Sequence, residues 1–554
     1  MKMTARILIP LIACMLLLTG AVQVGAAATA TAQWAEYVAT TASPWGAAVN
    51  PADGSVLVSG SFSADTVFGA GEPNETRLEL DGVQDMFVAK YGSDGALLWA
   101  IDNGSSIDSG TIATAVAFGP GGASVWVAIW FGPVITLGAG QENETTLYSF
   151  GGTSDICIAK YDTNGNLIFA IHVGGNDIDS LLSISASDSE SSIIVSGNFN
   201  SDEITFGNGE PSETTLTDNP TDMGPAFIAK YYDDGRLVWA KQTRGGPIYS
   251  PAMCVNPADG SIFLSGDYTE EPIFAPGESN ETTLHGYGGA DIAIAKYGAD
   301  GSLAWARRAG SGWYDKPYDV AVDPNDGSAV VVGIIGGEAL FGEGEANETY
   351  LPWLSGQDIF VAKYYANGSL AWARAATGTK YSFATAVAVN PLDDSIIVGG
   401  TIPQPMYFNT DQPEMFFVNG EGLFVAKYAA NGSILWVDTY DNYDAWRSVR
   451  ALAMNRVDGK VLIAGTFVDR LTFWNGAQAI TLVAGRPGYG DGFAASLDTS
   501  AMFPVPTRSS AILSCLAGLG WLVGRRRDRE KPATGHALIS LLRLWVQRQS
   551  RPPR

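Results

Sequence analysis

The sequence DMFVAKYGSDGALLWA, residues 85–100, joins an apolar run to a second apolar run through an Asp-Gly pair at Asp94-Gly95. Such a pair between two apolar runs is the strongest short signal of a β-hairpin. The phrase returns along the chain, with its Lys at positions 90, 160, 230, 296, 363 and 427 and Ser496 at the seventh position. The steps are 70, 70, 66, 67, 64 and 69 residues. Seven copies at one period are typical of a propeller or a solenoid.

The residues around this phrase predict two further strands in each repeat. A small apolar strand, such as ATAVAF from Ala113, comes before a turn, and a strand such as SVLVSGSF from Ser55 comes after one. Four antiparallel strands in each of seven repeats predict an all-β, seven-bladed β-propeller with four-stranded blades over residues 33–498. The Trp of the fourth strand fits a large filler between blades. It recurs as Trp99, Trp239, Trp305, Trp372 and Trp436, with Phe169 in the second repeat.

The two ends of the repeat array complement each other. The seventh repeat ends at Leu497 without a fourth strand of its own, while Trp34-Ala35 near the start of the body matches Trp99-Ala100. We therefore expect the N-terminal strand to complete the last blade. A ring closed in this way leaves no open sheet edge and favours a monomer.

The repeat resembles the bacterial SBBP-type β-propeller repeat, which has an apolar strand, a V-x-G-x-F strand, a D-x-F-V-A-K strand and a terminal aromatic strand. The resemblance covers residues 33–498 and implies the propeller architecture and a setting outside the cytoplasm. It implies no particular chemistry, because a fold of this kind hosts many functions.

The two termini predict export and a membrane tether. Residues 1–28 have a basic start, an apolar run and then small residues, as a signal peptide does. A linker with a Val505-Pro506 motif (499–508) leads to an apolar segment (509–524), predicted as a transmembrane or sorting helix, and then to a basic cytoplasmic tail (525–554). These features resemble a PEP-CTERM sorting segment, but the motif lacks Glu-Pro and the chain continues past the arginines, so a plain single-span anchor is the alternative. We expect the propeller at the cell envelope or cell surface.

Charge narrows the choice of partners. The formal net charge is −25; leaving out the nine basic and two acidic residues of 525–554, and Lys2 and Arg6, gives −34 for the body. A body this acidic disfavours nucleic acid as a partner. The four cysteines, Cys14, Cys157, Cys254 and Cys515, do not form a disulfide scaffold.

An acidic phrase recurs between the second and third strands of five repeats, beginning FGAGEPNETRL at Phe68. We expect these loops on the face that carries the connections between blades, where they can bind a surface ligand or Ca²⁺, which prefers several oxygen ligands. The alternative is a repeated turn whose side chains cap its own backbone. The candidate binding residues are Glu72, Glu75, Glu142, Glu144, Glu210, Glu213, Glu278, Glu281, Glu345 and Glu348.

Other polar residues of the repeat favour structural roles. An Asp lies five residues before the Lys in most copies, as in Asp85, Asp155 and Asp358, and predicts Asp–Lys pairing at strand ends or between blades. The isolated histidines His172, His285 and His536 form no recognisable metal or catalytic motif.

The sequence therefore favours a binding or scaffold module without evident catalysis and without a cofactor other than Ca²⁺. Its ligand, a protein or a glycan, is expected on the face of the blade connections, where loop aromatics add stacking surfaces. These aromatics are Tyr249, Trp313, Tyr314, Tyr443 and Trp446. The alternatives are an extracytoplasmic enzyme that acts on polysaccharide and a calcium-stabilised surface module.

Overall fold

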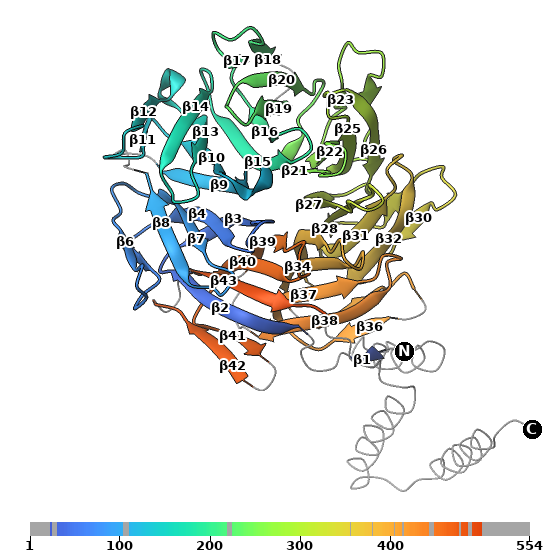
Figure 1. Ribbon diagram of the computed structural model, residues 1–554. Helices are drawn as coiled ribbons and strands as arrows, with labels where there is room; N and C mark the ends of the chain where they lie inside the picture. The colour runs from blue at the N-terminus through green and yellow to red at the C-terminus, as the bar shows by residue number, and fades with distance from the viewer. Residues whose placement is uncertain are drawn as a thin grey trace, which may run out of the picture. The chain divides into compact units, whose positions relative to one another are not determined.

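The computed structural model describes residues 23–24, 30–103, 110–218, 224–354, 356–378, 380–403, 405–412, 415–441, 448–475, 478–485 and 490–500. These residues form seven four-stranded antiparallel blades arranged around one axis, which confirms the predicted all-β propeller (Figure 1). Within the described ranges, the helical segments are two 3₁₀ turns, η1 (Pro120–Gly122) and η2 (Phe150–Gly152). Residues 23–24 of the predicted signal peptide (1–28) are described; the rest of it and the predicted segments 509–524 and 525–554 lie outside the described residues.

Each blade runs from an inner strand at the axis to an outer strand at the rim. The inner strands are β3 (Ser43–Val49), β9 (Thr111–Phe118), β15 (Asp179–Ser187), β21 (Tyr249–Val255), β27 (Lys316–Val322), β33 (Phe383–Val389) and β39 (Ser448–Met454). The second strands are β4 (Val56–Phe62), β10 (Val125–Phe131), β16 (Ser192–Phe199), β22 (Ile262–Tyr268), β28 (Ala329–Ile335), β34 (Ile396–Ile402) and β40 (Val461–Phe467).

The third strands carry the Ala-Lys-Tyr phrase, and the outer strands carry the Trp. The third strands are β7 (Asp85–Tyr91), β13 (Asp155–Tyr161), β19 (Ala226–Tyr232), β25 (Asp291–Tyr297), β31 (Asp358–Tyr364), β37 (Gly422–Tyr428) and β43 (Asp491–Asp498). The outer strands are β8 (Leu97–Asp102), β14 (Leu167–Val173), β20 (Leu237–Gln242), β26 (Leu303–Ala309), β32 (Leu370–Thr377), β38 (Ile434–Asp441) and, in the last blade, β2 (Thr31–Ala39).

The segment between the second and third strands folds into an additional two-stranded hairpin in each blade. The hairpins are β5 (Thr66–Phe68) with β6 (Thr76–Leu78), β11 (Val134–Leu137) with β12 (Thr145–Tyr148), β17 (Glu203–Phe206) with β18 (Thr214–Thr217), β23 (Ile273–Phe274) with β24 (Thr282–Thr283), β29 (Ala339–Phe341) with β30 (Thr349–Leu351), β35 (Met406–Phe408) with β36 (Phe416–Val418), and β41 (Arg470–Asn475) with β42 (Gln478–Val483). The short strand β1 (Gln23–Val24) pairs in parallel with β36.

Strand direction divides the ring into two faces. In blade 1, Phe62 pairs with Asp85 at one end, where the chain also leaves Asp102 for the next blade. We call this end the connection face. Val56 pairs with Tyr91 at the other end, which carries the tight turns between the first and second strands and between the third and fourth. We call it the turn face.

The blades are held together by apolar cores at their junctions. Each cluster of buried residues draws on two neighbouring blades, and one cluster lies at each junction of the described ring. Strand β7 shows how this arises, because its alternate residues Phe87 and Ala89 enter the core shared with the last blade. Met86 and Val88 enter the core shared with blade 2. The strand is therefore apolar on both faces because each face packs against a different blade.

The ring closes as the sequence predicts. Strand β2 pairs antiparallel with β43, so the blue N-terminal strand lies beside the last strand of the body in Figure 1. Trp34 of β2 is 7% exposed and donates its Nε1–H to the Ser93 carbonyl of blade 1 at 3.0 Å. The Gly95 turn sits under the indole, where a Cβ would approach the ring to 2.8 Å.

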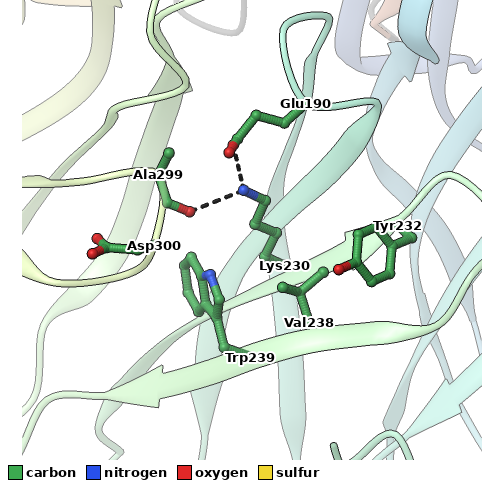
Figure 2. A pocket seen from close by; sticks show the side chains of 7 residues that line it. All are labelled: Glu190, Lys230, Tyr232, Val238, Trp239, Ala299 and Asp300. Carbon is green, nitrogen blue, oxygen red and sulfur yellow. Dashed lines mark hydrogen bonds and ion pairs between the residues drawn. The ribbon is translucent and has the colours of Figure 1, made fainter.

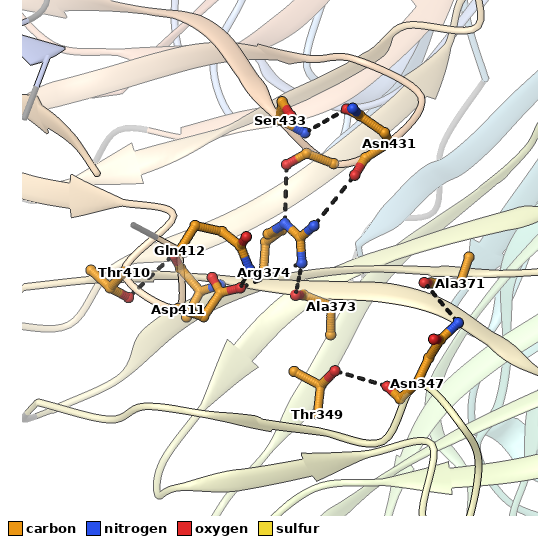
Figure 3. A network of polar contacts seen from close by, with 12 residues as sticks. Asn347, Thr349, Ala371, Ala373, Arg374, Thr410, Asp411, Gln412, Asn431 and Ser433 are labelled. Carbon is orange, nitrogen blue, oxygen red and sulfur yellow. Dashed lines mark hydrogen bonds and ion pairs between the residues drawn. The ribbon is translucent and has the colours of Figure 1, made fainter. Parts of the chain in front are cut away.

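The same contact joins other neighbouring blades. Trp99, Trp305 and Trp372 donate to carbonyl groups in the third-to-fourth-strand turn of the next blade at 2.9–3.0 Å. Arg374 adds polar contacts at one junction: it donates to the Gly432 carbonyl at 3.2 Å and lies 3.4 Å from the Asp411 carboxylate (Figure 3). The predicted role of the outer-strand Trp as a filler between blades is confirmed.

Candidate functional site: the mouth of the central channel

The acidic loops lie elsewhere than expected. In blade 1 the Glu72 carboxylate accepts the Leu97 N–H at 2.7 Å, and the Asn74 amide donates to the Leu97 carbonyl at 3.0 Å. Leu97 opens the outer strand at the turn face, so the hairpin folds back along the rim and its tip reaches that end of the blade. The prediction that these loops surround the connection face is therefore wrong. The position of each loop is set by tertiary contacts, because its tip binds backbone atoms more than twenty residues further along the chain.

Most of the predicted glutamates bind backbone or a salt-bridge partner within the repeat. Glu75 accepts the Gly71 N–H at 2.6 Å. The residues that repeat this contact are Glu144, Glu213, Glu281 and Glu348. Glu210 and Glu345 repeat the contact of Glu72 with the backbone N–H that opens the outer strand. Glu278 forms an ion pair with Lys241 instead. In blade 2, Gln141 accepts the equivalent N–H, and the neighbouring Glu142 is exposed. The geometry is that of a turn that caps its own backbone. In the described part of the chain, no three His, Cys, Asp or Glu residues are grouped as a metal site.

Five of the six recurring lysines are buried at the turn face, and four of them donate to a carbonyl of the next blade there: Lys90, Lys160, Lys230 and Lys427. Lys160, which is 8% exposed, donates to the Asp233 carbonyl of the next blade at 2.6 Å and pairs with its carboxylate at 2.8 Å. Lys363 pairs with Asp323 and Asp326 of its own blade, both at 3.3 Å. The predicted Asp–Lys pairing, at strand ends or between blades, is wrong, because the Asp begins the third strand at the connection face while the Lys lies at the turn face, about 16 Å further along.

The buried Asp residues hold loops of the connection face instead. Asp358 accepts the N–H groups of Leu354 and Gly378 at 2.8 and 2.9 Å. Asp291 accepts the Tyr287 N–H at 2.6 Å, and burial raises the pKa of its carboxyl to about 7. Asp155 binds His172 at 2.7 Å. His285 pairs with Glu271 at the surface, and His536 lies outside the described residues.

A cavity of about 510 Å³ opens on the turn face between blades 3 and 4. Figure 2 shows Lys230 in it, bound to Glu190 and to the Ala299 carbonyl, with Trp239 alongside. Trp99, Trp305 and Trp372 donate to the equivalent carbonyl at their junctions, whereas the Trp239 Nε1, like that of Trp436, has no hydrogen-bond acceptor among the described residues. This cavity is a local variation of the blade contact.

The central channel has a more distinctive feature at its connection-face end. The inner strand of each described blade has an irregular register at the same level, where it contains at least one more residue than its partner strand. β-Bulges of this kind turn a side chain out of the sheet. The extra residues are Trp45, Thr114, Leu182, Ser250 with Pro251, Tyr318, Thr385 and Arg450. We call this set the bulge ring.

The side chains of the bulge ring differ in chemistry between the two sides of the mouth. On blades 7 and 1, the Arg450 guanidinium lies over the Trp45 ring, 4.7 Å from its centroid, and Trp45 is 39% exposed. On blades 5 and 6, Tyr318 contacts Phe383 edge to face at 6.2 Å, and Lys316 lies 5.5 Å from the Tyr318 ring. The other side of the mouth carries small, hydroxyl and aliphatic residues. The mouth therefore presents aromatic faces and a guanidinium along one arc.

Further exposed aromatics lie at one end of this arc, on blade 4 and in the connection between blades 4 and 5. Tyr249, Trp313 and Tyr314 are 38%, 69% and 46% exposed, in segments at the connection face, as the sequence predicts. Tyr443 and Trp446 lie outside the described residues. Below the mouth, Asp319 accepts the Val387 N–H of the next blade at 2.8 Å, and burial raises the pKa of its carboxyl to about 7. The bulge ring escaped sequence analysis because its members differ from blade to blade, so no repeated letter marks the position.

Comparison with known proteins finds distant similarities that leave the activity open. No family model matches the chain. A curated relative, an uncharacterized WD repeat-containing protein of Acanthamoeba polyphaga mimivirus, is 26% identical over 197 residues, which is 34% of this chain and 13% of the relative. Among solved structures, Sqt1 from Chaetomium thermophilum has a TM-score of 0.35 at 10% identity, with 82% of this chain and 100% of that chain covered. AztD from Citrobacter koseri has a TM-score of 0.33 at 11% identity, with 80% and 99% covered.

The chain is a β-propeller with a WD-repeat-like fold. The matched relative is much longer than this chain, since the match spans 13% of it. Within the described residues, no helix is long and apolar enough to cross a membrane.

Proposed function

We propose that this protein is an exported, surface-displayed binding module whose propeller holds a carbohydrate at the channel mouth of its connection face. The observation that carries the proposal is the bulge ring, which turns Trp45, Tyr318 and Arg450 out of the inner strands at one level. Aromatic faces stack on the apolar faces of sugar rings, and half-exposed aromatics have ring surface to offer. A mouth of this chemistry suits binding of a sugar chain.

Export and attachment are part of the same proposal and come from the termini. The signal peptide predicted in residues 1–28 directs the propeller out of the cytoplasm. The apolar segment 509–524, with the arginines that follow it, keeps the propeller at the envelope as a sorting segment of PEP-CTERM type or as a plain anchor. A sugar-binding ring at this location would hold the cell to its own or a foreign polysaccharide coat.

The test uses residues 30–500 and a panel of soluble neutral and acidic polysaccharides, with affinity measured by titration calorimetry. We expect at least one polysaccharide to bind and Trp45→Ala to weaken its binding about tenfold, which corresponds to about 1.4 kcal/mol. The matched control is Trp474→Ala, because Trp474 is 48% exposed on the hairpin β41–β42, away from the channel. Absence of binding across the panel, or equal binding by wild type and Trp45→Ala, would overturn the proposal.

A further inference from the structure

Arg450 is an arginine of the channel mouth that forms no ion pair with a carboxylate among the described residues. Its guanidinium carries five N–H donors, yet within the described part of the chain it interacts with the Trp45 ring at 4.7 Å and electrostatically with Tyr318, and it forms no hydrogen bond or ion pair with a carboxylate. The arginines that form ion pairs with carboxylates are Arg77, Arg236, Arg307, Arg308 and Arg374. Arg450 therefore has hydrogen-bonding capacity to offer a ligand.

The surroundings of Arg450 make this capacity energetically significant. The residue is exposed at the mouth, but nearby protein lowers the pKa of its guanidinium by desolvation. A partly desolvated cation gains more from an opposite charge than a fully solvated one, because water screens the interaction less. Lys316, the cation across the mouth, lies 3.4 Å from the buried carboxylate of Asp267 and is already neutralised. The available positive charge of the mouth is thus concentrated at Arg450. A carboxylate bound directly by this residue responds to it more than to the distant charges that give the body its net −34, because salt screens charges beyond about 10 Å.

We infer that the carbohydrate held at the channel mouth is acidic, with a sugar carboxylate bound by Arg450 while the ring bearing that carboxylate stacks on Trp45. This inference rests on the proposed function and specifies its ligand as a uronate-containing polysaccharide. The planar guanidinium matches a carboxylate with two parallel N–H···O bonds. The part of the Trp45 side chain that the guanidinium leaves exposed, 39% of its surface, provides the apolar contact that the same sugar needs. A neutral polysaccharide would use the indole and leave the guanidinium unpaired.

The experiment compares polygalacturonate with its fully methyl-esterified form, which keeps the sugar chain and removes the charge. For residues 30–500 we expect at least tenfold tighter binding of the acid form. Arg450→Gln should abolish this preference, and Arg450→Lys should retain part of it, because the ammonium keeps the charge but loses the planar fork. The matched control is Arg236→Gln, which alters an Arg–aromatic pair on the turn face, with Arg236 5.3 Å from the Tyr232 ring.

The outcomes separate the two proposals. If Arg450→Gln keeps the preference for the acid form, or if wild type binds both forms equally, the inference about the carboxylate is overturned. In that case loss of binding in Trp45→Ala still supports the channel mouth as the carbohydrate site. If Trp45→Ala binds like wild type, the site itself is overturned. A thermal unfolding curve for each variant checks folding, which the exposed position of Arg450 should leave intact.

Discussion

Replacing Trp34 by Ala tests how strongly the N-terminal strand closes the ring. The Trp34 side chain is buried at the junction of blades 7 and 1, rests on the Gly95 turn and donates to the Ser93 carbonyl at 3.0 Å. Removing a buried Trp side chain costs about 3–5 kcal/mol. The lost hydrogen bond contributes about 1 kcal/mol within that range. We therefore expect Trp34→Ala to lower the free energy of unfolding by about 3–5 kcal/mol.

The assay is urea unfolding of residues 30–500, followed by far-ultraviolet circular dichroism. Trp372→Ala is the positive control, since Trp372 makes the same contact at an internal junction and is 8% exposed. Trp474→Ala, on an exposed hairpin, should change stability by less than about 0.5 kcal/mol. If Trp34→Ala loses as little stability as Trp474→Ala, rather than as much as Trp372→Ala, then the Trp34 contact does not stabilise the closing junction, and the reasoning is refuted.

Three further results are expected. Gly368→Ala should lower the free energy of unfolding by about 1–3 kcal/mol, because the new Cβ would lie 2.6 Å from Trp305. Gly344→Ala is the control: this glycine has a similar positive φ but open space around it, so the loss of stability should be smaller. Equal losses in the two variants would contradict this expectation. Burial raises the pKa of Asp291 to about 7 and of Asp358 to about 6. The protonated carboxyls stabilise the fold fully below the pKa of the unfolded chain, and this stabilisation is lost as the pH rises through 6–7. The free energy of unfolding should therefore fall from pH 5 to pH 8, and it should fall less steeply in Asp291→Asn. A rise in the free energy of unfolding over that range would count against this expectation. Glu345→Ala should lower stability by about 1 kcal/mol because the Leu370 N–H loses its acceptor, and Glu345→Gln, which keeps an amide oxygen, should lower it less in the same urea assay.

The repeat period and the turn signals were sufficient to predict the blades. The Asp-Gly and Asn-Gly turns have a further role, because glycines such as Gly95 and Gly432 lie against the Trp of the preceding blade. The match of Trp34 with the outer-strand Trp predicted the closing strand for the same reason. Local patterns were informative here because each blade repeats the same contacts.

The predictions failed where the partner lies far along the chain. The Glu72 side chain caps Leu97, and the buried lysines bind turns of the next blade, so neither contact can be read from spacing within one phrase. The channel mouth was missed for a different reason. A bulge adds one residue to a strand without a fixed residue type, and its functional meaning depends on which side chains, such as Trp45 and Arg450, meet across a junction.

Both proposals require that blades 7 and 1 are neighbours, because Trp45 belongs to β3 and Arg450 to β39. The direct measurement is disulfide formation in Ala35→Cys/Ala495→Cys, whose Cα atoms are register partners of β2 and β43. Directly opposed strand residues lie about 4.5–5.5 Å apart, within the range for a disulfide. The matched control is Ala35→Cys/Ala426→Cys, with the second cysteine at the equivalent position of blade 6. We predict by peptide mass spectrometry that the first pair cross-links and the control does not; a cross-link in the control pair, or none in the first, would contradict the closed ring.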